Sequence, residues 1–537
     1  MMRAPRTQNP APLDAIIVGA GFAGLYMLHK LRGLGLSARV LESGSGIGGT
    51  WYWNRYPGAR CDVESMEYSY QFSEELQQEW VWSERYAGQP EILSYLQHVV
   101  DRFDLLPDIQ LDTRVNTAHF DETTNLWRVE TTRGAFVAPY CIMATGCLSS
   151  SHTPDIDGMD RFGGPTYHTG HWPHEGVDFS GKRVGLIGTG SSGVQATPII
   201  AEEAAELTVF QRTATYAVPA HNHPLDPEYQ QDVKNRYPAF REASRKTHLG
   251  FGSDYPSAED PGIEVDQEGR DARFEEYWQR GGLFFMGAFT DLLLDTEVNE
   301  SAAEFVRGKI RDRVNDPAIA ARLSPTQVLG CKRLCADTEY YEAFNRPNVH
   351  LVDLNETPIE TFTERGICVD GTEHEYDAIV FATGFDAMTG SLDRIDIRGK
   401  SGRRLQEKWA EGPRTYLGLG TTGFPNFFIV AGPGSPSVLT NMVPAIEQHV
   451  DWIADCITHM RRKGFRQIEA TQDAEDQWVE HTNEIASFTL FPTCNSWYLG
   501  ANVPGKPRVF MPYLSFPLYV EKCDEVAARG YEGFVLK

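Results

Sequence analysis

The sequence of 537 residues lacks the features of membrane and secreted proteins. No apolar run is long enough to cross a bilayer, and the N-terminus has neither the apolar core nor the small-residue cleavage site of a signal peptide. Low-complexity tracts and internal repeats are also missing, apart from two glycine clusters, and disorder is expected only in the tail through Pro12. We therefore expect a folded protein with a cytoplasmic location and no membrane partner.

Basic residues are scarce in this chain. Its 49 Lys and Arg stand against 74 Asp and Glu, which gives a formal net charge of -25. Because this field repels phosphate backbones, nucleic acid is a poor candidate partner. An acidic protein that binds a polyanionic nucleotide must also keep a local cluster of positive charge at that site. The length predicts about three domains, or two that are enlarged by insertions.

Paired cysteine motifs are absent as well. The nine cysteines are scattered, and no two of them form a Cys-x-x-Cys pair. The odd number and the lack of a companion histidine pattern predict free thiols and no metal site.

A first nucleotide-binding pattern begins with a short apolar strand at residues 15–18, followed by a glycine-rich turn and a helical pattern. The three glycines of the turn are Gly19, Gly21 and Gly24. They let the backbone approach a pyrophosphate at the helix N-terminus. The next strand, 38–41, ends in Glu42, 18 residues after the last glycine. A carboxylate there accepts hydrogen bonds from a free ribose diol and repels a 2′-phosphate, so we expect FAD at this unit.

A second unit of the same kind begins with a strand at residues 184–187. Its turn consists of Gly188, Thr189, Gly190, Ser191, Ser192 and Gly193. The next strand, 207–210, is followed by Gln211 and Arg212 instead of an acidic residue. A guanidinium at this position suits a 2′-phosphate, so the second unit is expected to bind NADPH.

Two later strands end in a Thr-Gly turn, at residues 143–146 and 377–384. Because each follows a nucleotide unit, the NADPH domain is expected to be inserted within the FAD domain. The predicted fold is α/β, with two Rossmann-like dinucleotide-binding domains and a helical insertion in the NADP domain. The expected FAD-binding domain comprises residues 1–150 and 386–537, the NADP-binding domain residues 151–222 and 329–385, and the insertion residues 223–328.

Two longer patterns distinguish this chain from other proteins with two glycine turns. Residues 162–173 have the spacing F-x-G-x-x-x-H-x-x-x-W-P, and residues 49–62 have the spacing G-x-W-x-x-x-x-Y-P-G-x-x-x-D. Both resemble the patterns of type I (class B) Baeyer-Villiger monooxygenases, flavoproteins that use NADPH and O2 to insert one oxygen beside a ketone carbonyl. Within that family the chain is similar to phenylacetone and steroid monooxygenases. One departure is Ser515-Phe516-Pro517, where relatives usually have a Gly-Gly pair.

The resemblance implies the oxidation of ketones to esters or lactones through a flavin C4a-peroxide. Arg333 matches the family's catalytic arginine, a permanent cation that stabilises the anionic adduct, and Asp62 matches the carboxylate that orients it. The implied partners are a small ketone and O2, and the chain is expected to be a monomer or a weak oligomer.

The same matching assigns further residues to each ligand. The expected FAD contacts are Glu42, Thr50, Trp51, Asp62, Tyr68, Val115 and Met442. The expected NADPH contacts are Arg60, Thr189, Gly190, Ser191, Ser192, Gly193, Arg212, Thr213, Lys332, Arg333 and Trp497. Substrate choice is expected to depend on Cys147, Leu148, Ser437, Val438, Leu439, Thr440 and Met442. Core packing is an alternative role for Trp497. His168 of the first pattern also suits a structural histidine, and we assign it no proton transfer.

Three other functions share parts of these patterns. A flavin monooxygenase that oxygenates nitrogen or sulfur has both glycine units but lacks the Trp172-Pro173 ending. A disulfide reductase needs a redox Cys-x4-Cys beside its flavin, whereas Met66 stands five residues after Cys61. A non-catalytic NADPH sensor could keep both nucleotide sites, but it would not need Arg333 together with Asp62. The sequence leaves open whether the ketone is aryl, cyclic or a steroid.

Overall fold

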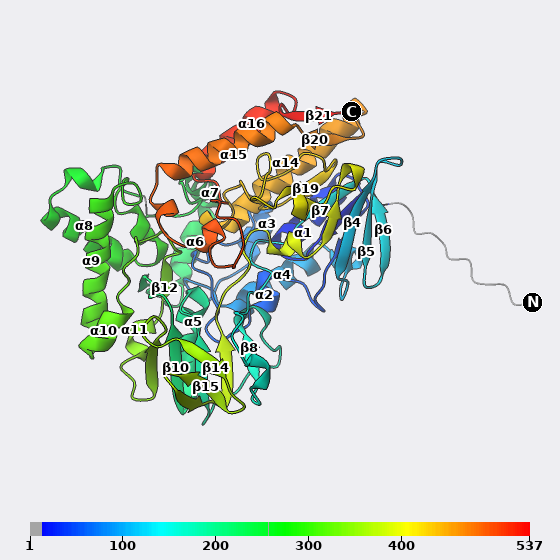
Figure 1. Cartoon of the computed structure of the whole chain (residues 1–537). Helices are drawn as coiled ribbons and strands as arrows, with labels where there is room; N and C mark the ends of the chain where they lie inside the picture. The colour runs from blue at the N-terminus through cyan, green and yellow to red at the C-terminus, as the bar shows by residue number, and fades with distance from the viewer. Residues whose placement is uncertain (1–12, 256) are drawn as a thin grey trace, which may run out of the picture.

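Two five-stranded parallel sheets form the frame of the molecule (Figure 1). The computed structural model describes residues 13–255 and 257–537, so the expected disorder through Pro12 lies outside the described residues. The first sheet has the order β19 (Phe427–Ile429), β7 (Tyr140–Met143), β1 (Ala15–Val18), β2 (Ala38–Leu41) and β3 (Ile109–Gln110). The second has the order β13 (Val349–Asp353), β10 (Glu206–Gln211), β9 (Arg183–Ile187), β17 (Ala378–Phe381) and β8 (Thr166–His168). Two parallel sheets of this kind confirm the predicted α/β fold class.

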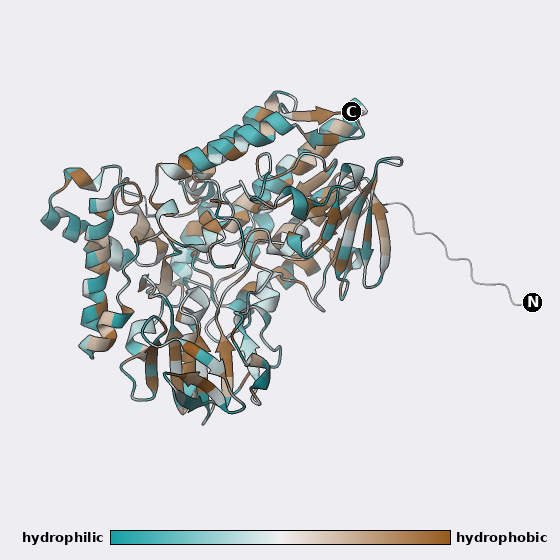
Figure 2. Cartoon of the chain, in the orientation of Figure 1, coloured by the Kyte–Doolittle hydropathy of each residue, from teal (hydrophilic) through white to brown (hydrophobic). Residues whose placement is uncertain are grey.

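The central strands are mostly apolar and almost completely buried because both faces of each sheet are covered. All residues of β1, β7 and β17 are buried, and in β10 only the first residue is exposed. Figure 2 shows this contrast, with hydrophobic strands inside and hydrophilic surfaces on the outer helices. All five strands of the second sheet lie between β7 and β19 in the sequence. The chain therefore forms the second sheet before it returns to add the last strand of the first.

Helices that follow the glycine turns cover the sheets. Helix α1 (Phe22–Gly33) packs against α14 (Met442–Lys463) on the first sheet, and α5 (Ser191–Glu203) packs against β9 and β10 of the second. The remaining helices outside the insertion are α2 (Thr50–Trp53), α3 (Glu74–Glu79), α4 (Gln89–Arg102), α11 (Tyr340–Ala343), α12 (Gly390–Asp393), α13 (Leu405–Lys408), α15 (Gln472–Ser487) and α16 (Phe516–Ala528).

Between the second sheet's strands β10 and β13 lies a largely helical stretch, whose α8, α9 and α10 project to one side of the molecule in Figure 1. Its helices before β12 (Cys335–Asp337) are α6 (Pro227–Asn235), α7 (Tyr237–Lys246), α8 (Gln267–Arg280), α9 (Thr296–Arg313) and α10 (Pro317–Leu323), and α11 follows β12. Four of them begin after an aspartate whose carboxylate accepts hydrogen bonds from backbone N–H groups of the first turn. Such caps satisfy donors that the helix cannot satisfy itself, so they fix where each helix starts.

Smaller sheets complete the fold. They are β18 (Asp396–Arg398), β4 (Val115–Asp121), β5 (Leu126–Thr131) and β6 (Gly134–Ala138); β14 (Ile359–Phe362), β15 (Gly366–Val369) and β16 (Thr372–Glu375); β11 (Ala217–Pro219) with β12 (Cys335–Asp337); and β20 (Ile468–Ala470) with β21 (Phe534–Leu536). The parallel pair β11–β12 is important for function because β12 begins two residues after Arg333.

The expectation of free thiols is wrong for two of the nine cysteines. Cys331 and Cys494 form a disulfide, with their Cα atoms 6.2 Å apart, and the other seven are free. The two residues are 163 positions apart in the chain, so their pairing depends on the tertiary fold and leaves no spacing motif in the sequence. None of the helices among the described residues combines the length and apolar surface needed to span a bilayer.

Candidate active site

A cavity of about 1580 Å³ opens at the carboxyl ends of both large sheets. Its lining includes Gly19 after β1, Ala144 after β7, Gly188 after β9 and Ala382 after β17. Ligands of open α/β sheets bind in this place, outside the carboxyl ends of the strands. The volume exceeds the 300–1,000 Å³ or so of ordinary small-molecule pockets, so the cavity has room for more than one ligand.

The first glycine turn leads directly into the N-terminus of α1. Its N-cap residue, Gly21, offers no side chain, so backbone N–H groups of the first turn are left for a ligand. Gly19 and Gly21 line the cavity, whereas Gly24 lies behind its wall. A Cβ atom on Gly24 would stand 1.8 Å from the carbonyl oxygen of Gly19, so this glycine allows the helix to pack closely against the turn.

Glu42 is held rigidly at the end of β2. Its side chain lines the cavity and is buried, with 5% of the residue exposed. The Oε2 atom accepts a hydrogen bond from the backbone N–H of Ala20 at 2.8 Å, and Oε1 accepts one from Gly44 at 2.8 Å. These two bonds fix the direction of the carboxylate. The other residues predicted to contact FAD, all of which line the same cavity, are Thr50, Trp51, Asp62, Tyr68, Val115 and Met442.

The second glycine turn repeats the geometry of the first. Helix α5 begins after Gly190, again without a side-chain cap, and a Cβ atom on Gly190 would meet no atom within 4 Å. Gly193 is packed like Gly24, because its Cβ atom would lie 2.2 Å from the carbonyl oxygen of Gly188. Gly193 does not line the cavity, whereas the residues that do are Gly188, Thr189, Gly190, Ser191, Ser192 and Thr213. A second helix N-terminus is thus open to an anion.

Arg212 and Lys332 place two positive charges at this second turn. Both line the cavity, and within residues 13–255 and 257–537 neither forms an ion pair. Burial lowers the pKa of Lys332, and the nearby Arg212 lowers it further. Arg60 is different, because its guanidinium pairs with Glu84 at 3.2 Å and donates to the carbonyl of Tyr86 at 2.9 Å. In a chain of net charge -25, two adjacent cations without carboxylate partners form a site suited to an anion.

Arg333 is fixed between the two turns by three hydrogen bonds. Its Nε and Nη2 atoms donate to the Oδ2 and Oδ1 atoms of Asp62, each at 2.8 Å, and Nη1 donates to the carbonyl of Val438 at 2.8 Å. The side chain is 24% exposed, and the residue lines the cavity. Burial disfavours the charged guanidinium, but the attraction of Asp62 outweighs it and raises the pKa of Arg333 above its ordinary value. A permanent cation therefore faces the cavity in one orientation.

Two contacts of Arg333 were not predicted from the sequence. One is the backbone carbonyl of Val438, and the other is the phenol of Tyr498, whose interaction also favours the charged guanidinium. Burial raises the pKa of Tyr498 to about 12, so the phenol keeps its proton. The only signal in the sequence was that Tyr498 follows Trp497. In the structure Trp497 lines the cavity, and its ring lies 4.3 Å from that of Tyr498 at a tilt of 44°.

The residues predicted to select the substrate divide into two groups. Cys147, Leu148, Val438, Thr440 and Met442 line the cavity, whereas Ser437 and Leu439 do not. The hydroxyl of Ser437 donates instead to the carbonyl of Ala431, and Leu439 packs into an apolar cluster. Along residues 437–440, Val438 and Thr440 therefore face the cavity, whereas Ser437 and Leu439 support its wall.

The pattern of residues 162–173 contains β8 of the second sheet, and the N–H of Trp172 donates to the carbonyl of Trp53 at 3.4 Å, at the end of α2. Nδ1 of His168 accepts a hydrogen bond from the backbone N–H of Gly170 at 2.9 Å, and Nε2 lies 3.3 Å from Oγ1 of Thr383. Burial lowers the pKa of His168 to about 4, so the ring is neutral near pH 7. Neither His168 nor Trp172 lines the cavity. The histidine is satisfied by its neighbours, which fits a structural part.

Comparisons with known proteins give a consistent result. The family model described as pyridine nucleotide-disulphide oxidoreductase matches residues 16–266. The chain is 44% identical over 531 residues to a Baeyer-Villiger monooxygenase of Pseudooceanicola batsensis, covering 98% of this chain and 96% of that protein. It is 43% identical over 529 residues to the phenazine N-monooxygenase PhzNO1 of Lysobacter antibioticus, covering 97% of each.

Solved structures agree over the whole length. Oxidized steroid monooxygenase bound to NADP is 52% identical, with a TM-score of 0.93 and coverage of 98% of this chain and 99% of that one. The OTEMO complex with FAD and NADP is 42% identical, with a TM-score of 0.94 and coverage of 98% and 99%.

Proposed function

The chain belongs to the flavin-dependent Baeyer-Villiger monooxygenases, and from this membership we propose how its own residues carry out the reaction. The enzyme uses FAD and NADPH, and it converts a ketone, O2, NADPH and a proton into an ester or lactone, NADP+ and water. The observation that carries the assignment of roles is the Arg333–Asp62 pair, which lies at the cavity between two glycine turns.

The cavity fits two dinucleotides. Each glycine turn ends at a helix N-terminus without a side-chain cap, which suits a pyrophosphate. Glu42 would accept hydrogen bonds from the ribose hydroxyls of FAD, while Arg212 and Lys332 would bind the 2′-phosphate of NADPH. When bound, the reduced flavin would activate O2, of which one oxygen atom enters the product and the other leaves as water.

Arg333 acts as a fixed positive charge beside the reacting atoms. Oxygen transfer to a ketone develops negative charge, and a preorganised cation in a partly dry cavity stabilises it without reorganisation. Arginine serves better than lysine here because its guanidinium does not titrate when it is desolvated. Asp62 is a positioning residue, since its two bonds to Arg333 prevent the guanidinium from turning away.

The division into domains follows the two sheets. We assign residues 1–150 and 386–537 to an FAD-binding domain, residues 151–222 and 329–385 to an NADP-binding domain, and residues 223–328 to a helical insertion. Strands β1 to β3, β7 and β19 support the first assignment, and β8 to β10, β13 and β17 support the second. A cytoplasmic monomer or weak oligomer is the simplest state for an enzyme that depends on NADPH.

The substrate region favours a ketone with an apolar body. Beside Arg333 the wall consists of Cys147, Leu148, Val438 and Met442, and an apolar cluster that includes Met388, Phe491 and Met511 supports it. An apolar wall binds hydrocarbon groups, while the one fixed cation takes the polar end. The similarity to PhzNO1 adds a second candidate, the oxygenation of a ring nitrogen.

The test is product analysis with the purified yellow protein. NADPH loss and product mass are followed together in aerated buffer with phenylacetone, cyclohexanone, a steroid ketone and a phenazine. Ester or lactone that carries one added oxygen for each NADPH supports the ketone assignment, whereas N-oxide alone would replace it. If only hydrogen peroxide forms with every ketone and phenazine, these substrate classes are ruled out.

A further inference from the structure

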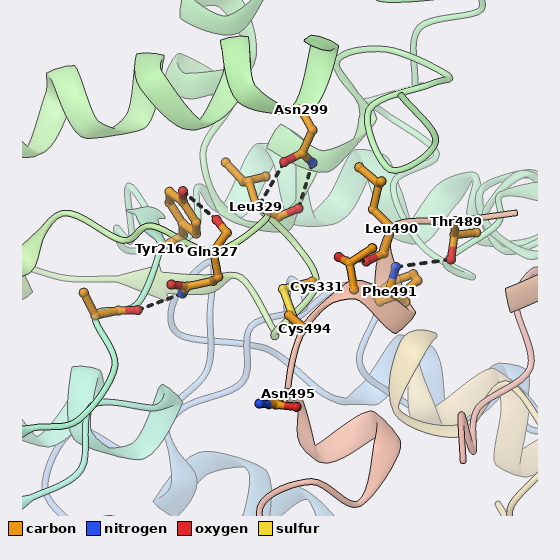
Figure 3. The surroundings of a disulfide bond; sticks show 12 residues. Tyr216, Asn299, Gln327, Leu329, Cys331, Thr489, Leu490, Phe491, Cys494 and Asn495 are labelled. Atoms are coloured by element: carbon orange, nitrogen blue, oxygen red, sulfur yellow. Dashed lines mark hydrogen bonds between the residues drawn. A yellow bond between two sulfur atoms is a disulfide. The ribbon is translucent and has the colours of Figure 1, made fainter. Parts of the chain in front are cut away.

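The disulfide Cys331–Cys494 joins two walls of the cavity (Figure 3). Cys331 is followed at once by Lys332 and Arg333, the cations assigned to the nucleotide and to the reaction. Cys494 itself lines the cavity, as do Asn495, Ser496, Trp497, Ala501 and Asn502 of the same segment. One covalent bond thus links the cationic turn to the segment on the other side.

The turn on the Cys331 side is firmly anchored. Asn299 of α9 donates from Nδ2 to the carbonyl of Leu329 at 3.0 Å, and its Oδ1 accepts from the N–H of Leu329 at 2.9 Å. The hydroxyl of Tyr216 donates to the carbonyl of Gln327 at 2.9 Å. Figure 3 shows these bonds around the turn. Cys331 is fully buried, so its position is set by the protein around it.

The segment on the Cys494 side contains little regular structure, and side-chain bonds hold mainly its far end, where Asn502 Nδ2 donates to the carbonyl of Phe385 at 2.7 Å and Lys506 pairs with Asp386 at 2.5 Å. Between α15 and α16 the described chain contains only two three-residue helical turns, Phe491–Thr493 and Trp497–Leu499. From residue 494 to 501 the backbone N–H bonds return to the segment itself, for example from Ser496 to Cys494 and from Ala501 to Ser496. The disulfide is therefore the covalent link between the first residues of this segment and the turn, beside the contact of Tyr498 with Arg333.

The same segment carries polar atoms that lack partners. Oγ of Ser496, a residue 1% exposed, has no hydrogen-bond partner, and neither has Oδ1 of Asn502. Both residues line the cavity. Buried polar atoms without a partner are costly unless a ligand satisfies them, so this segment is built to contact a polar ligand in the cavity. The nearest assigned ligand is NADP+, because Lys332 and Arg333 lie across the disulfide from these residues.

We propose that Cys331 and Cys494 form a reversible thiol–disulfide site that controls how tightly residues 494–502 hold NADP+. The natural reductant is a dithiol, either a small one or a protein dithiol. This proposal rests on the nucleotide site proposed above. In the oxidised state the segment is preorganised against the cationic turn, and in the reduced state it loses that anchor and must be ordered again by each nucleotide that binds.

The disulfide can be reduced by thiol–disulfide exchange and formed again by oxidation. One thiolate of the reductant attacks Sγ of Cys494, which is more exposed than Cys331, and Cys331 leaves as a thiolate. The second thiol of the reductant then displaces Cys494, so two electrons and two protons reach the protein and the reductant becomes a disulfide. Oxidation by hydrogen peroxide reverses this, since two thiols and one peroxide give the disulfide and two waters.

The other cysteines provide the controls. Burial raises the pKa values of Cys61, Cys147 and Cys335, which also line or adjoin the site, so their thiols stay protonated and react slowly. Cys368 on β15 is the one free cysteine of the described residues that is not buried. A Cys368→Ser variant therefore removes the most accessible of the free thiols in the described residues without touching the cavity.

The experiment measures NADP+ binding to the FAD-loaded full-length protein in both redox states. Peptide mapping under non-reducing conditions assigns the disulfide, and treatment with dithiothreitol should add 2 Da to the intact mass. We expect reduction to raise the Kd for NADP+ at least about fivefold, measured by the change in protein fluorescence. Reoxidation with hydrogen peroxide should restore the original Kd.

The variants separate this proposal from others. Cys331→Ser/Cys494→Ser should bind NADP+ as the reduced protein does and ignore dithiothreitol, while Cys368→Ser should respond like the unaltered chain. An unchanged Kd in a protein whose disulfide has been reduced would overturn the proposal, and so would two thiols that peroxide does not join. If neither state binds NADP+ although FAD is bound, the nucleotide site itself is wrong, which is a different failure. FAD content and circular dichroism of each variant show that it is folded.

Discussion

The two nucleotide sites of this enzyme share the same turn and helix geometry, and they differ at the residues that follow the second strand of each unit. In each, a glycine turn leads to an uncapped helix N-terminus, and the last glycine, Gly24 or Gly193, packs against the carbonyl of the first. The sites then diverge, because the first has the buried carboxylate of Glu42 and the second has Arg212 next to Lys332. The backbone suits a pyrophosphate in both cases, and we propose that the charge after the second strand selects the nucleotide.

The largest effect is expected where the two sites meet, at Arg333. Arg333→Ala removes the fixed cation but leaves both glycine turns intact, so NADPH should still reduce the flavin. Product formation should fall by at least about 100-fold, as for the loss of one donor to a developing charge. Stopped-flow absorbance measures flavin reduction, and mass spectrometry measures the product.

The control for this variant is Arg333→Lys, which keeps a charge but loses the bidentate bond to Asp62. This variant should be faster than Arg333→Ala but slower than the unaltered enzyme, because the charge is kept while its position is less well fixed. Full oxygenation by Arg333→Ala would remove Arg333 from its assigned role.

A pair of matched glycine variants tests the shared backbone design. Gly24→Ala and Gly193→Ala each place a Cβ atom against a backbone carbonyl oxygen, at 1.8 and 2.2 Å, so each must displace its own helix. We expect Gly24→Ala to lose at least about 90% of its FAD, and Gly193→Ala to stay yellow but bind NADPH at least about tenfold more weakly. FAD content after gel filtration and NADPH titration provide the measurements, and the reverse pattern would exchange the two assignments.

The sequence predicted the parts of this comparison that are local. A buried strand, a glycine turn and a helix follow one another within about thirty residues, so β1, β2, β9 and β10 were found within one residue of their ends. The same holds for the fold class, because alternation of these units implies parallel sheets.

Features that depend on distant residues could not be read from local pattern. The disulfide joins residues 163 positions apart, and the approach of Tyr498 and the Val438 carbonyl to Arg333 depends on loop conformation. Ser437 and Leu439 were expected to affect substrate choice because they match the family's residues beside the flavin, but neither of them lines the cavity. Ser515, where relatives usually have glycine, adopts a positive φ of 81°, and only the structure shows that a serine takes this conformation.

A smaller effect is expected when one positive charge is removed from the second site. Arg212→Ala should weaken NADPH about tenfold while NADH is unaffected, because only the 2′-phosphate loses a charge-assisted bond. Lys332 keeps one cation in place, which limits the loss. The ratio of kcat/KM for the two nucleotides measures the effect, and an unchanged ratio would contradict the 2′-phosphate assignment. Arg322→Ala is the matched control, at a cation that is paired with Glu356 and does not line the cavity.

The two nucleotide regions also differ in their buried carboxyl groups. Two such groups lie beside the first site, and we expect them to have no effect on nucleotide choice. One oxygen of Glu67 accepts from Oγ of Ser244 and from the N–H of Gly252, each at 2.8 Å, and one oxygen of Glu447 accepts from the N–H of Gln71 at 2.7 Å. The second oxygen of each carboxyl has no partner. Burial raises the pKa of both groups to about 7.

Stability should therefore depend on pH through Glu67 and Glu447. A carboxyl whose pKa is higher in the folded state than the unfolded value of about 4.4 takes up a proton on folding, so its contribution is complete below that value and is lost as pH rises through 7. The loss should amount to about 1–3 kcal/mol per group between pH 5 and 8. Glu67→Gln keeps the shape but cannot titrate, so it should flatten this part of the profile and leave the NADPH preference unchanged. Thermal unfolding monitored by FAD fluorescence from pH 5 to 8 measures both proteins, and parallel profiles would show that Glu67 is ionised at neutral pH despite its burial.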